Sequence, residues 1–202
     1  MVTSGNVTCK LLDLQKAKAS TGIGFLDHML DQFNSHAQVG VELQYPGTDY
    51  NRNADQHQQD FLREVGEQVG TAMLDMIADI STDRSSTFYC PLDEALTKCV
   101  IRKGLEEGCL SYTLAPYGKF PATTGRTHLG RLQTAAIESF WEGLANKSGL
   151  HITLEKIRGN NAHHIVESSF KAFSRALRNY LDGTDTVSEA NKALINMYGH
   201  DS

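Results

Sequence analysis

The chain has 202 residues and a formal net charge of −5, because 24 aspartates and glutamates outnumber 19 lysines and arginines. Hydrophobic residues make up 40% of the sequence. This composition is typical of a globular protein with one medium-sized domain, and it excludes disordered, collagen-like and coiled-coil chains. An acidic chain without a basic run is a poor binder of nucleic acid, so we expect no nucleic-acid partner.

The sequence contains no stretch of about eighteen apolar residues, so we expect no membrane insertion. Its first thirty residues lack the basic start and apolar segment of a secretory signal. We therefore expect an intracellular protein, in the cytoplasm or an organelle matrix. In such a compartment the 4 cysteines remain reduced thiols.

In chain order, the first half is predicted to form a helix, a strand and a helix. Apolar residues follow one helical face over 25–33, alternate with polar residues over 39–45, and return to helical spacing over 61–80. Pro46 and Gly47 predict a turn after the strand. Short runs with strand character follow at 87–89, 99–101 and 109–112.

The second half repeats this order, with a helix predicted over 137–144, a strand over 150–154 and a helix over 165–177. Asn161 is a plausible N-cap for the last helix, and Gly183 is expected to end it. The sequence therefore predicts a single α+β domain over residues 1–202, built from two related halves at about 22–81 and 131–182. The alternative is chance recurrence of a common unit.

The most specific local pattern lies at residues 161–167, where the last predicted helix begins. His163 and Glu167 are four residues apart, so they share one helix face. An imidazole and a carboxylate on one face form a good half-site for a first-row divalent metal. His164 points about 100° away and does not easily join them. The alternative is a polar pair near a helix N-terminus that binds no metal.

Two other features carry weaker signals. His28 lies between core positions of the first predicted helix, and taken alone it is a partly buried histidine with a hydrogen bond. Asp93 and Glu94 are adjacent carboxylates that could serve acid–base chemistry, although two solvated charges in a surface turn are the simpler interpretation. The sequence has no Gly-rich phosphate loop and no Gly-x-Ser-x-Gly nucleophile elbow.

Three motifs, in this order, resemble the imidazoleglycerol-phosphate dehydratase family. They are TGIGFLDHML at 21–30, PLDEAL at 91–96, and NAHHIVE at 161–167 followed by FKAFSRALR at 170–178. The resemblance runs over roughly residues 21–194. It implies an α+β fold similar to the second domain of ribosomal protein S5, with two βαβ-type halves and helices sandwiched between two sheets. Superposed halves should then place His28 on Ser139 and Asp55 on His163.

The resemblance also implies a site and an assembly. Members of the family remove water from imidazole glycerol phosphate in histidine biosynthesis, and two manganese ions coordinate the imidazole ring. Each half contributes one histidine from its first helix and a His-His-x-x-Glu from its second. The sites lie at subunit contacts of a large homo-oligomer, built from trimers into a 24-mer.

This chain departs from the family pattern at the implied ligand positions. In the first half, His-His-x-x-Glu reads Asp55, Gln56 and Gln59, and the histidine expected before Phe140 is Ser139. By resemblance, one metal would use the positions of His28, Gln56, His163 and Glu167, and the other those of Asp55, Gln59, Ser139 and His164. Glutamine and serine are weak ligands, so the second position keeps only His164 and Asp55.

The implied phosphate ligands change as well. Arg84 and Lys171 survive at positions that resemble phosphate ligands, but an expected arginine is replaced by Glu106. A carboxylate there repels a dianionic phosphate instead of binding it in a bidentate contact. The late Ser/Thr-Lys-Gly motif of the family reads Ala-Asn-Lys-Ala at 190–193.

We therefore expect a catalytically degenerate homologue that acts as a structural or assembly subunit, in a homo-oligomer or a heteromeric complex. It would bind no metal or at most one divalent ion, manganese by resemblance, and form an assembly smaller than the 24-mer. The alternative is an active manganese-dependent carbon–oxygen lyase, whose ligands are restored by another subunit or by a register that uses His57 and His128. A third hypothesis is a single-metal protein with a different small ligand.

Overall fold

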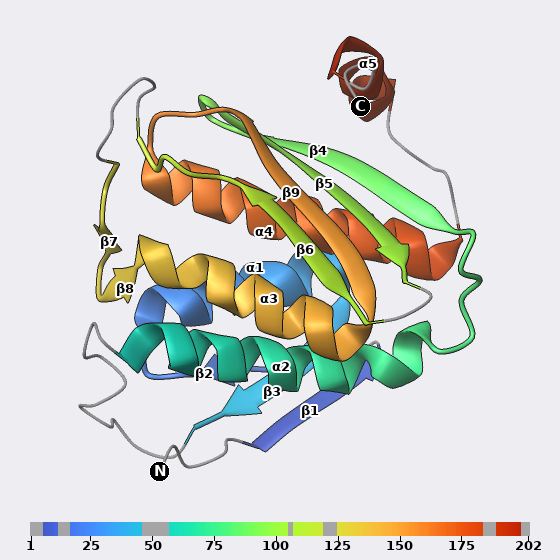
Figure 1. The fold of residues 1–202 in the computed structure, drawn as a ribbon, viewed down its shortest axis with the longest axis horizontal. Coiled ribbons are helices and arrows are strands. Elements are labelled where there is room, and N and C mark those ends of the chain that lie inside the picture. Colours follow the sequence, from blue (N-terminus) through green and yellow to red (C-terminus); the bar gives the residue numbers. More distant parts are fainter. Residues whose placement is uncertain are drawn as a thin grey trace.

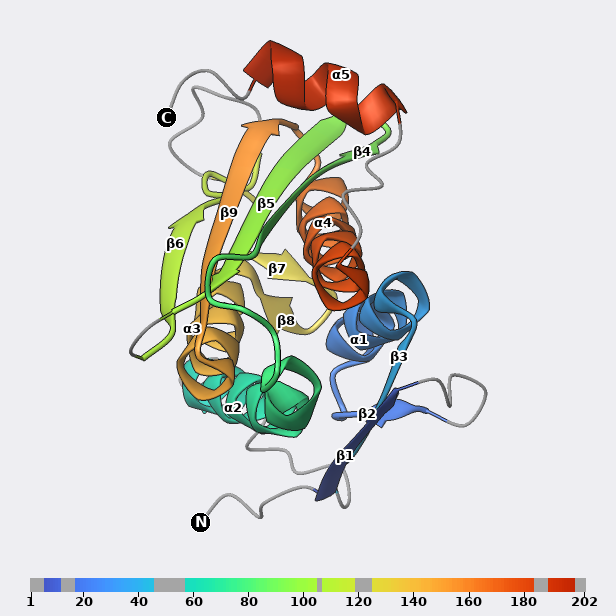
Figure 2. The ribbon, with the colours of Figure 1, turned by 90° about the vertical axis from the view of Figure 1, so that its right-hand side faces the viewer.

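The fold was examined in a computed structural model, which describes residues 6–11, 17–45, 57–104, 107–118, 125–183 and 189–198. A three-stranded sheet of order β1-β3-β2 and a four-stranded sheet of order β4-β5-β9-β6 enclose a layer of helices (Figures 1 and 2). The predicted α+β fold, with helices sandwiched between two sheets, is therefore confirmed.

The strands of the first sheet are β1 (Asn6–Leu11), β2 (Ala19–Ser20) and β3 (Val39–Gln44). The second sheet contains β4 (Ser85–Leu92), β5 (Ala95–Lys103), β6 (Cys109–Thr113) and β9 (Leu150–Arg158). Its β4, β5 and β9 are antiparallel neighbours, whereas β6 runs parallel to β9. A short hairpin of β7 (His128–Leu129) and β8 (Leu132–Gln133) precedes a 3-10 turn (Thr134–Ala136).

The helices are α1 (Gly24–Ala37), α2 (Gln58–Ile77), α3 (Ile137–Ser148), α4 (Ala162–Asp182) and α5 (Glu189–Tyr198). The four predicted helices correspond to α1–α4, although α2 ends before residue 80. The Asn161 side chain accepts a hydrogen bond from the backbone N–H of His163, and Gly183 ends α4 at a φ of 65°. Both capping predictions are therefore confirmed.

The helices pack in pairs that each combine a helix from the first half with one from the second: α1 lies against α4, and α2 lies against α3. The order helix-strand-helix occurs twice, as α1-β3-α2 and as α3-β9-α4. The superposition of the two halves stays a prediction. Asp55, Gln56, Glu106 and the turn at 46–47 lie outside the described residues.

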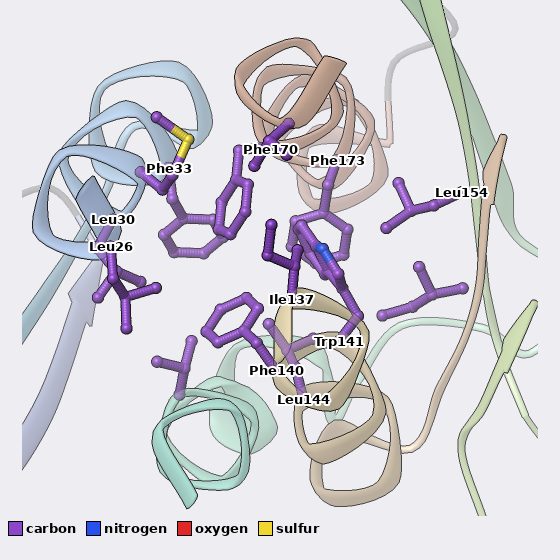
Figure 3. Close-up of a cluster of buried hydrophobic side chains, with 14 of the residues drawn as sticks. Leu26, Leu30, Phe33, Ile137, Phe140, Trp141, Leu144, Leu154, Phe170 and Phe173 are labelled. Atoms are coloured by element: carbon purple, nitrogen blue, oxygen red, sulfur yellow. The ribbon is translucent and has the colours of Figure 1, made fainter. Parts of the chain in front are cut away.

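A buried cluster of aromatic rings joins α1, α3 and α4 (Figure 3). The Trp141 ring centroid lies 4.6 Å from that of Phe170 and 5.0 Å from that of Phe173. Phe33 of α1 stacks on Phe173 of α4, with 5.9 Å between the ring centroids. Each fully buried ring contributes on the order of 2 kcal/mol to folding. The cluster thus fixes α4 against both α1 and α3, and with it the polar residues at the start of α4.

Candidate metal site

The contact between α1 and α4 brings together His28, His163 and Glu167. One ligand atom from each of these side chains lies within 4.8 Å of the other two. The Nε2 atoms of His163 and His28 lie 2.9 Å and 3.9 Å, respectively, from Oε2 of Glu167. The three residues belong to one chain, one from α1 and two from α4. Within the described residues, this is the one such group of three histidine, cysteine or acidic side chains.

The hairpin between β4 and β5 holds the beginning of α4 in place. Oε1 of Glu94 accepts hydrogen bonds from the backbone N–H groups of Asn160, at 3.1 Å, and of Asn161, at 2.7 Å. These groups precede the helix and have no partner within it, so the carboxylate satisfies donors that the helix leaves open. The first turn of α4, which carries His163, is therefore fixed to the four-stranded sheet.

Glu167 is the electrostatic centre of the site. Its side chain is 12% exposed, compared with 44% for His28 and 45% for His163. Lys171, one turn further along α4, places Nζ 2.9 Å from Oε1 of Glu167. Burial acts to raise the pKa of Glu167, but Lys171, the hydrogen bond with His163 and the charge of His28 outweigh it and lower the pKa. The carboxylate is thus kept anionic.

Two imidazoles and an anionic carboxylate are a suitable donor set for a divalent ion with open coordination positions. The same atoms also form a complete network without an ion, because His163 and Lys171 each contact one oxygen of Glu167. Binding a metal at this site therefore requires Oε2 of Glu167 to exchange its hydrogen bond with His163 for the ion.

His164 faces away from this group, as its offset on the helix predicted. Its Nδ1 lies 2.6 Å from Oε2 of Glu94, and its Nε2 lies 3.4 Å from Oδ2 of Asp93. The hydrogen bond with His164, together with those from Asn161 and Asn160, lowers the pKa of Glu94 to about 2. As the simpler interpretation expected, Asp93 and Glu94 lie exposed in a surface turn. Glu94 in addition ties the β4–β5 hairpin to α4 through these contacts.

The corresponding contact between α2 and α3 has a different chemistry. Ser139 is buried on α3, and Gln59 is exposed on α2. The neighbouring Gln58 is fully buried, and its amide bridges the β7–β8 hairpin by donating to the Arg131 carbonyl and accepting from the Gln133 N–H. His57 and His128 form no cluster of three ligands within the described part of the chain.

Arg84 and Lys171, the two residues that resemble phosphate ligands, contact different parts of α4 within one chain. Lys171 contacts Glu167, at the candidate metal site. Arg84 instead donates from Nη1 to the Tyr180 carbonyl at 3.0 Å, near the C-terminal end of α4. At 1.5 Å per residue, this carbonyl is roughly 13 Å along the helix from Lys171. Asn191, from the altered late motif, is buried on α5 and contacts β4.

Several residues that shape the site carried little signal in the sequence. The roles of Glu94, Gln58 and Asn191 depend on partners that are 66 to 102 residues away in the chain. No periodicity predicts such contacts. The PLDEAL motif at 91–96 was the one hint, and it pointed to Glu94 without indicating its partner.

A helical layer between two sheets, with a His, His and Glu group where helices of the two halves meet, defines an α+β protein with a candidate metal site. The family model for imidazoleglycerol-phosphate dehydratase matches residues 21–177. The chain belongs to the imidazoleglycerol-phosphate dehydratase family. No helix within the described residues is long and apolar enough to cross a membrane.

The imidazoleglycerol-phosphate dehydratase of Staphylococcus carnosus (strain TM300) is one relative of this chain. The two are 32% identical over 177 residues, which cover 87% of this chain and 84% of the relative. The imidazoleglycerol-phosphate dehydratase 1, chloroplastic, of Triticum aestivum is 34% identical over 163 residues, 80% of this chain. The chain spans 55% of the length of that protein.

Solved structures show the same similarity. The crystal structure of the dehydratase from Staphylococcus aureus subsp. aureus N315 matches with a TM-score of 0.72 and 29% identity, over 89% of this chain and 94% of that chain. The structure of the Pyrococcus furiosus protein in complex with (S)-C348 matches with a TM-score of 0.66 at 19% identity, over 95% and 97% of the two chains, and supports the fold.

Proposed function

We propose that this chain is a structural or assembly subunit of the dehydratase family that does not itself catalyse the dehydration. One contrast carries the proposal. The α1/α4 contact keeps three strong ligand residues within 4.8 Å of one another. At α2 and α3, Gln59 and Ser139 stand where the family resemblance implies ligands of the second ion. A hydroxyl and a neutral amide are weak ligands for a first-row divalent ion.

The family reaction, as the resemblance implies it, uses two ions to hold the imidazole ring of the substrate. Two-metal chemistry depends on both ions, because each stabilises part of the charge that develops in the reaction. A chain that lacks the ligands of one ion loses that stabilisation. The carboxylate of Glu106, where the family pattern has an arginine, adds repulsion toward the phosphate of the substrate.

The metal content follows from the same argument. We expect at most one divalent ion per chain, manganese by resemblance, held by His28, His163 and Glu167. An ion with open positions supplies a Lewis acid. The chain's own residues would join α1 to α4 through it, and Lys171 would remain beside Oε1 of Glu167. A different small ligand on this single ion is the second function that this site favours.

The test measures metal and turnover in the same preparation. The purified protein is loaded with manganese, dialysed, and assayed for metal by mass spectrometry and for turnover of imidazole glycerol phosphate. The Staphylococcus aureus enzyme serves as the positive control for the assay. We expect one equivalent or less and no turnover. Two equivalents per chain, or measurable turnover, would overturn the proposal in favour of an active enzyme.

Single substitutions locate the ion. His163→Ala should abolish metal uptake, because it removes one of three strong ligands. His128→Ala is the matched histidine control, and it should bind as much metal as the unmodified chain. A loss of uptake in His128→Ala would support the alternative ligand register instead. Ser139→His alone should not restore dehydration, because Gln59 and Glu106 remain.

The proposal includes an intracellular homo-oligomer or heteromeric complex. A partner subunit that supplies the ligands missing at α2 and α3 would give this chain an assembly role without a complete site of its own. Co-purification with a second family member, and turnover only in that complex, would be the outcome expected for a heteromer.

A further inference from the structure

The β4 edge of the four-stranded sheet is suited to pairing with another strand wherever it is uncovered. β4 is an edge strand, and its eight residues, SSTFYCPL, include no charged side chain. Natural proteins protect such edges with lysines, prolines, bulges or a covering element, because exposed backbone groups template association. In β4, Pro91 lacks an N–H, which limits pairing to the part of the strand that precedes it.

α5 covers this edge (Figure 2). Its Asn191 is 3% exposed and forms two hydrogen bonds with the backbone of Tyr89. Oδ1 accepts from the Tyr89 N–H at 3.2 Å, and Nδ2 donates to the Tyr89 carbonyl at 2.5 Å. A side-chain amide offers one acceptor and donors, as a peptide group does. Asn191 thus takes the place of a neighbouring strand.

The same arrangement recurs inside the molecule. Asn34 of α1 pairs its amide with the N–H and carbonyl of Val41 on β3, both at 2.9 Å. Gln58 of α2 bridges the backbone of the β7–β8 hairpin. Those two amides lie on helices packed within the sandwich. Asn191 instead lies on α5, which packs outside the sandwich against β4 and exposes 70% of Met197 (Figure 2). α5 can therefore separate from β4 without separating the helices of the sandwich.

The backbone geometry specifies what an uncovered β4 could pair with. Tyr89 directs its N–H and carbonyl to the open edge, and strand residues alternate between edges, so Thr87 and Ser85 direct theirs the same way. An antiparallel partner with the same sequence places Thr87 opposite Thr87 and Tyr89 opposite Ser85. Each of these pairs can exchange two backbone hydrogen bonds. A twofold contact of this kind is self-complementary, and no charge opposes it.

We propose that α5 protects the β4 edge from pairing, because Asn191 occupies the backbone groups of Tyr89. Release of α5 lets β4 pair antiparallel with β4 of a second copy of this chain. The occupant is a second copy because the strand is uncharged and self-complementary about Thr87. This inference is independent of metal binding and of dehydration, and it concerns how the chain controls its own association.

Asn191→Leu tests whether Asn191 protects the β4 edge, because leucine has a similar size and its side chain neither donates nor accepts hydrogen bonds. Asn196→Leu, at an exposed position of the same helix, is the matched control. Particle mass is measured against concentration by sedimentation, and hydrogen exchange is followed at the Tyr89 amide. We expect Asn191→Leu to exchange at least tenfold faster at low concentration and to double its particle mass as concentration rises. Asn196→Leu should match the unmodified chain in both.

Thr87→Lys identifies the pairing strand, because a twofold pair would set two lysines opposite each other and like charges in that position repel. The double variant Asn191→Leu/Thr87→Lys should keep the fast exchange and lose the added association. Association that persists in the double variant would overturn pairing through β4. Unchanged particle mass and unchanged hydrogen exchange in Asn191→Leu would overturn the proposal that Asn191 protects the β4 edge. Should Asn191→Leu fail to fold, Asn191→Asp is measured in the same assays, because it replaces the Nδ2 donor with a carboxylate oxygen that repels the Tyr89 carbonyl.

Discussion

Glu94 shows how one exposed carboxylate can organise two elements. It accepts hydrogen bonds from two backbone N–H groups ahead of α4 and contacts His164 on the first turn of that helix. These contacts give Glu94 a pKa of about 2, below its usual 4.5, with the hydrogen bond from His164 as the largest cause. The side chain therefore fixes the position of α4, and through it that of His163.

The lowered pKa gives a pH-dependent stability. A carboxyl group with a depressed folded pKa stabilises the protein fully above its unfolded pKa, and this contribution is lost as pH falls toward the folded value. We expect Glu94→Gln to be less stable than the unmodified chain at pH 7. The difference should shrink as pH falls from about 5 toward 2. Urea unfolding at a series of pH values measures it, and a pH-independent difference would contradict this prediction.

The cysteines provide a second residue-scale test. Burial raises the pKa of Cys90 to about 11, against the smaller opposing influence of Lys171 and Arg175, and burial also raises that of Cys99. Cys109 is exposed. Because the thiolate is the reactive form, iodoacetamide at pH 8 should label Cys109 and spare the two buried thiols.

Labelling of Cys90 should increase only as pH approaches about 11, where its thiolate begins to form. Mass spectrometry of digested peptides identifies the labelled sites, and a urea-unfolded sample controls for reagent activity. Labelling of Cys90 at the rate of Cys109 at pH 8 would show that the Cys90 side chain is not buried.

At the scale of elements, the close approach of α2 and α3 depends on glycines. A Cβ atom on Gly66 would overlap the backbone carbonyl of Phe140, and one on Gly70 would meet the carbonyl oxygen of Leu144 at 2.6 Å. On the other helix, Gly143 faces the carbonyl of Arg63 in the same way. Backbone atoms cannot turn aside as a flexible side chain can, so the two helices are held closer than side chains would allow.

Gly66→Ala should therefore destabilise the protein by about 1–3 kcal/mol, because α2 must move away from α3 to admit the methyl group. Gly24→Ala is the matched control. A Cβ on Gly24 meets nothing within 4 Å, so this change should be neutral or stabilise α1 by up to about 1 kcal/mol. Thermal unfolding compares the two variants. Equal stability of both would contradict the close contact between α2 and α3.

Helices were predicted correctly from the sequence where burial of one face imposes a regular spacing of apolar residues. The apolar faces of α1, α2, α3 and α4 were readable because one stripe of each helix faces the core. The short strands β2, β7 and β8 have two residues each, too few to establish alternation. α5 was not predicted. Asn191 attaches it to β4 by polar contacts with Tyr89, which is 102 residues away in the chain.

At the scale of the whole molecule, the three candidate metal ligands lie within one chain. His28, His163 and Glu167 come from two helices of the same subunit, so an ion held by them links α1 to α4 and does not by itself join subunits. The aromatic cluster around Trp141 and Phe173 already joins these helices without metal. We therefore expect the fold to persist when metal is removed.

The assembly should be smaller than the 24-mer that the family resemblance implies, or part of a heteromeric complex, since the second set of ligand positions is substituted. Light scattering with and without a chelator measures the particle mass, and the Staphylococcus aureus enzyme provides the reference. We expect the same mass in both conditions. A homogeneous 24-mer that forms with manganese and dissociates on chelation would contradict this prediction.

The sequence by itself determined the α+β class, the four core helices, both caps of α4 and the family, because apolar periodicity and contiguous motifs are local properties. It also placed His163 and Glu167 on one helix face, four residues apart. Only the tertiary structure decided that His28 joins them from the same chain, and that Glu94 binds His164. Packing of α1 on α4, and of the β4–β5 hairpin on the start of α4, sets those contacts. They depend on distances between segments that no local pattern encodes.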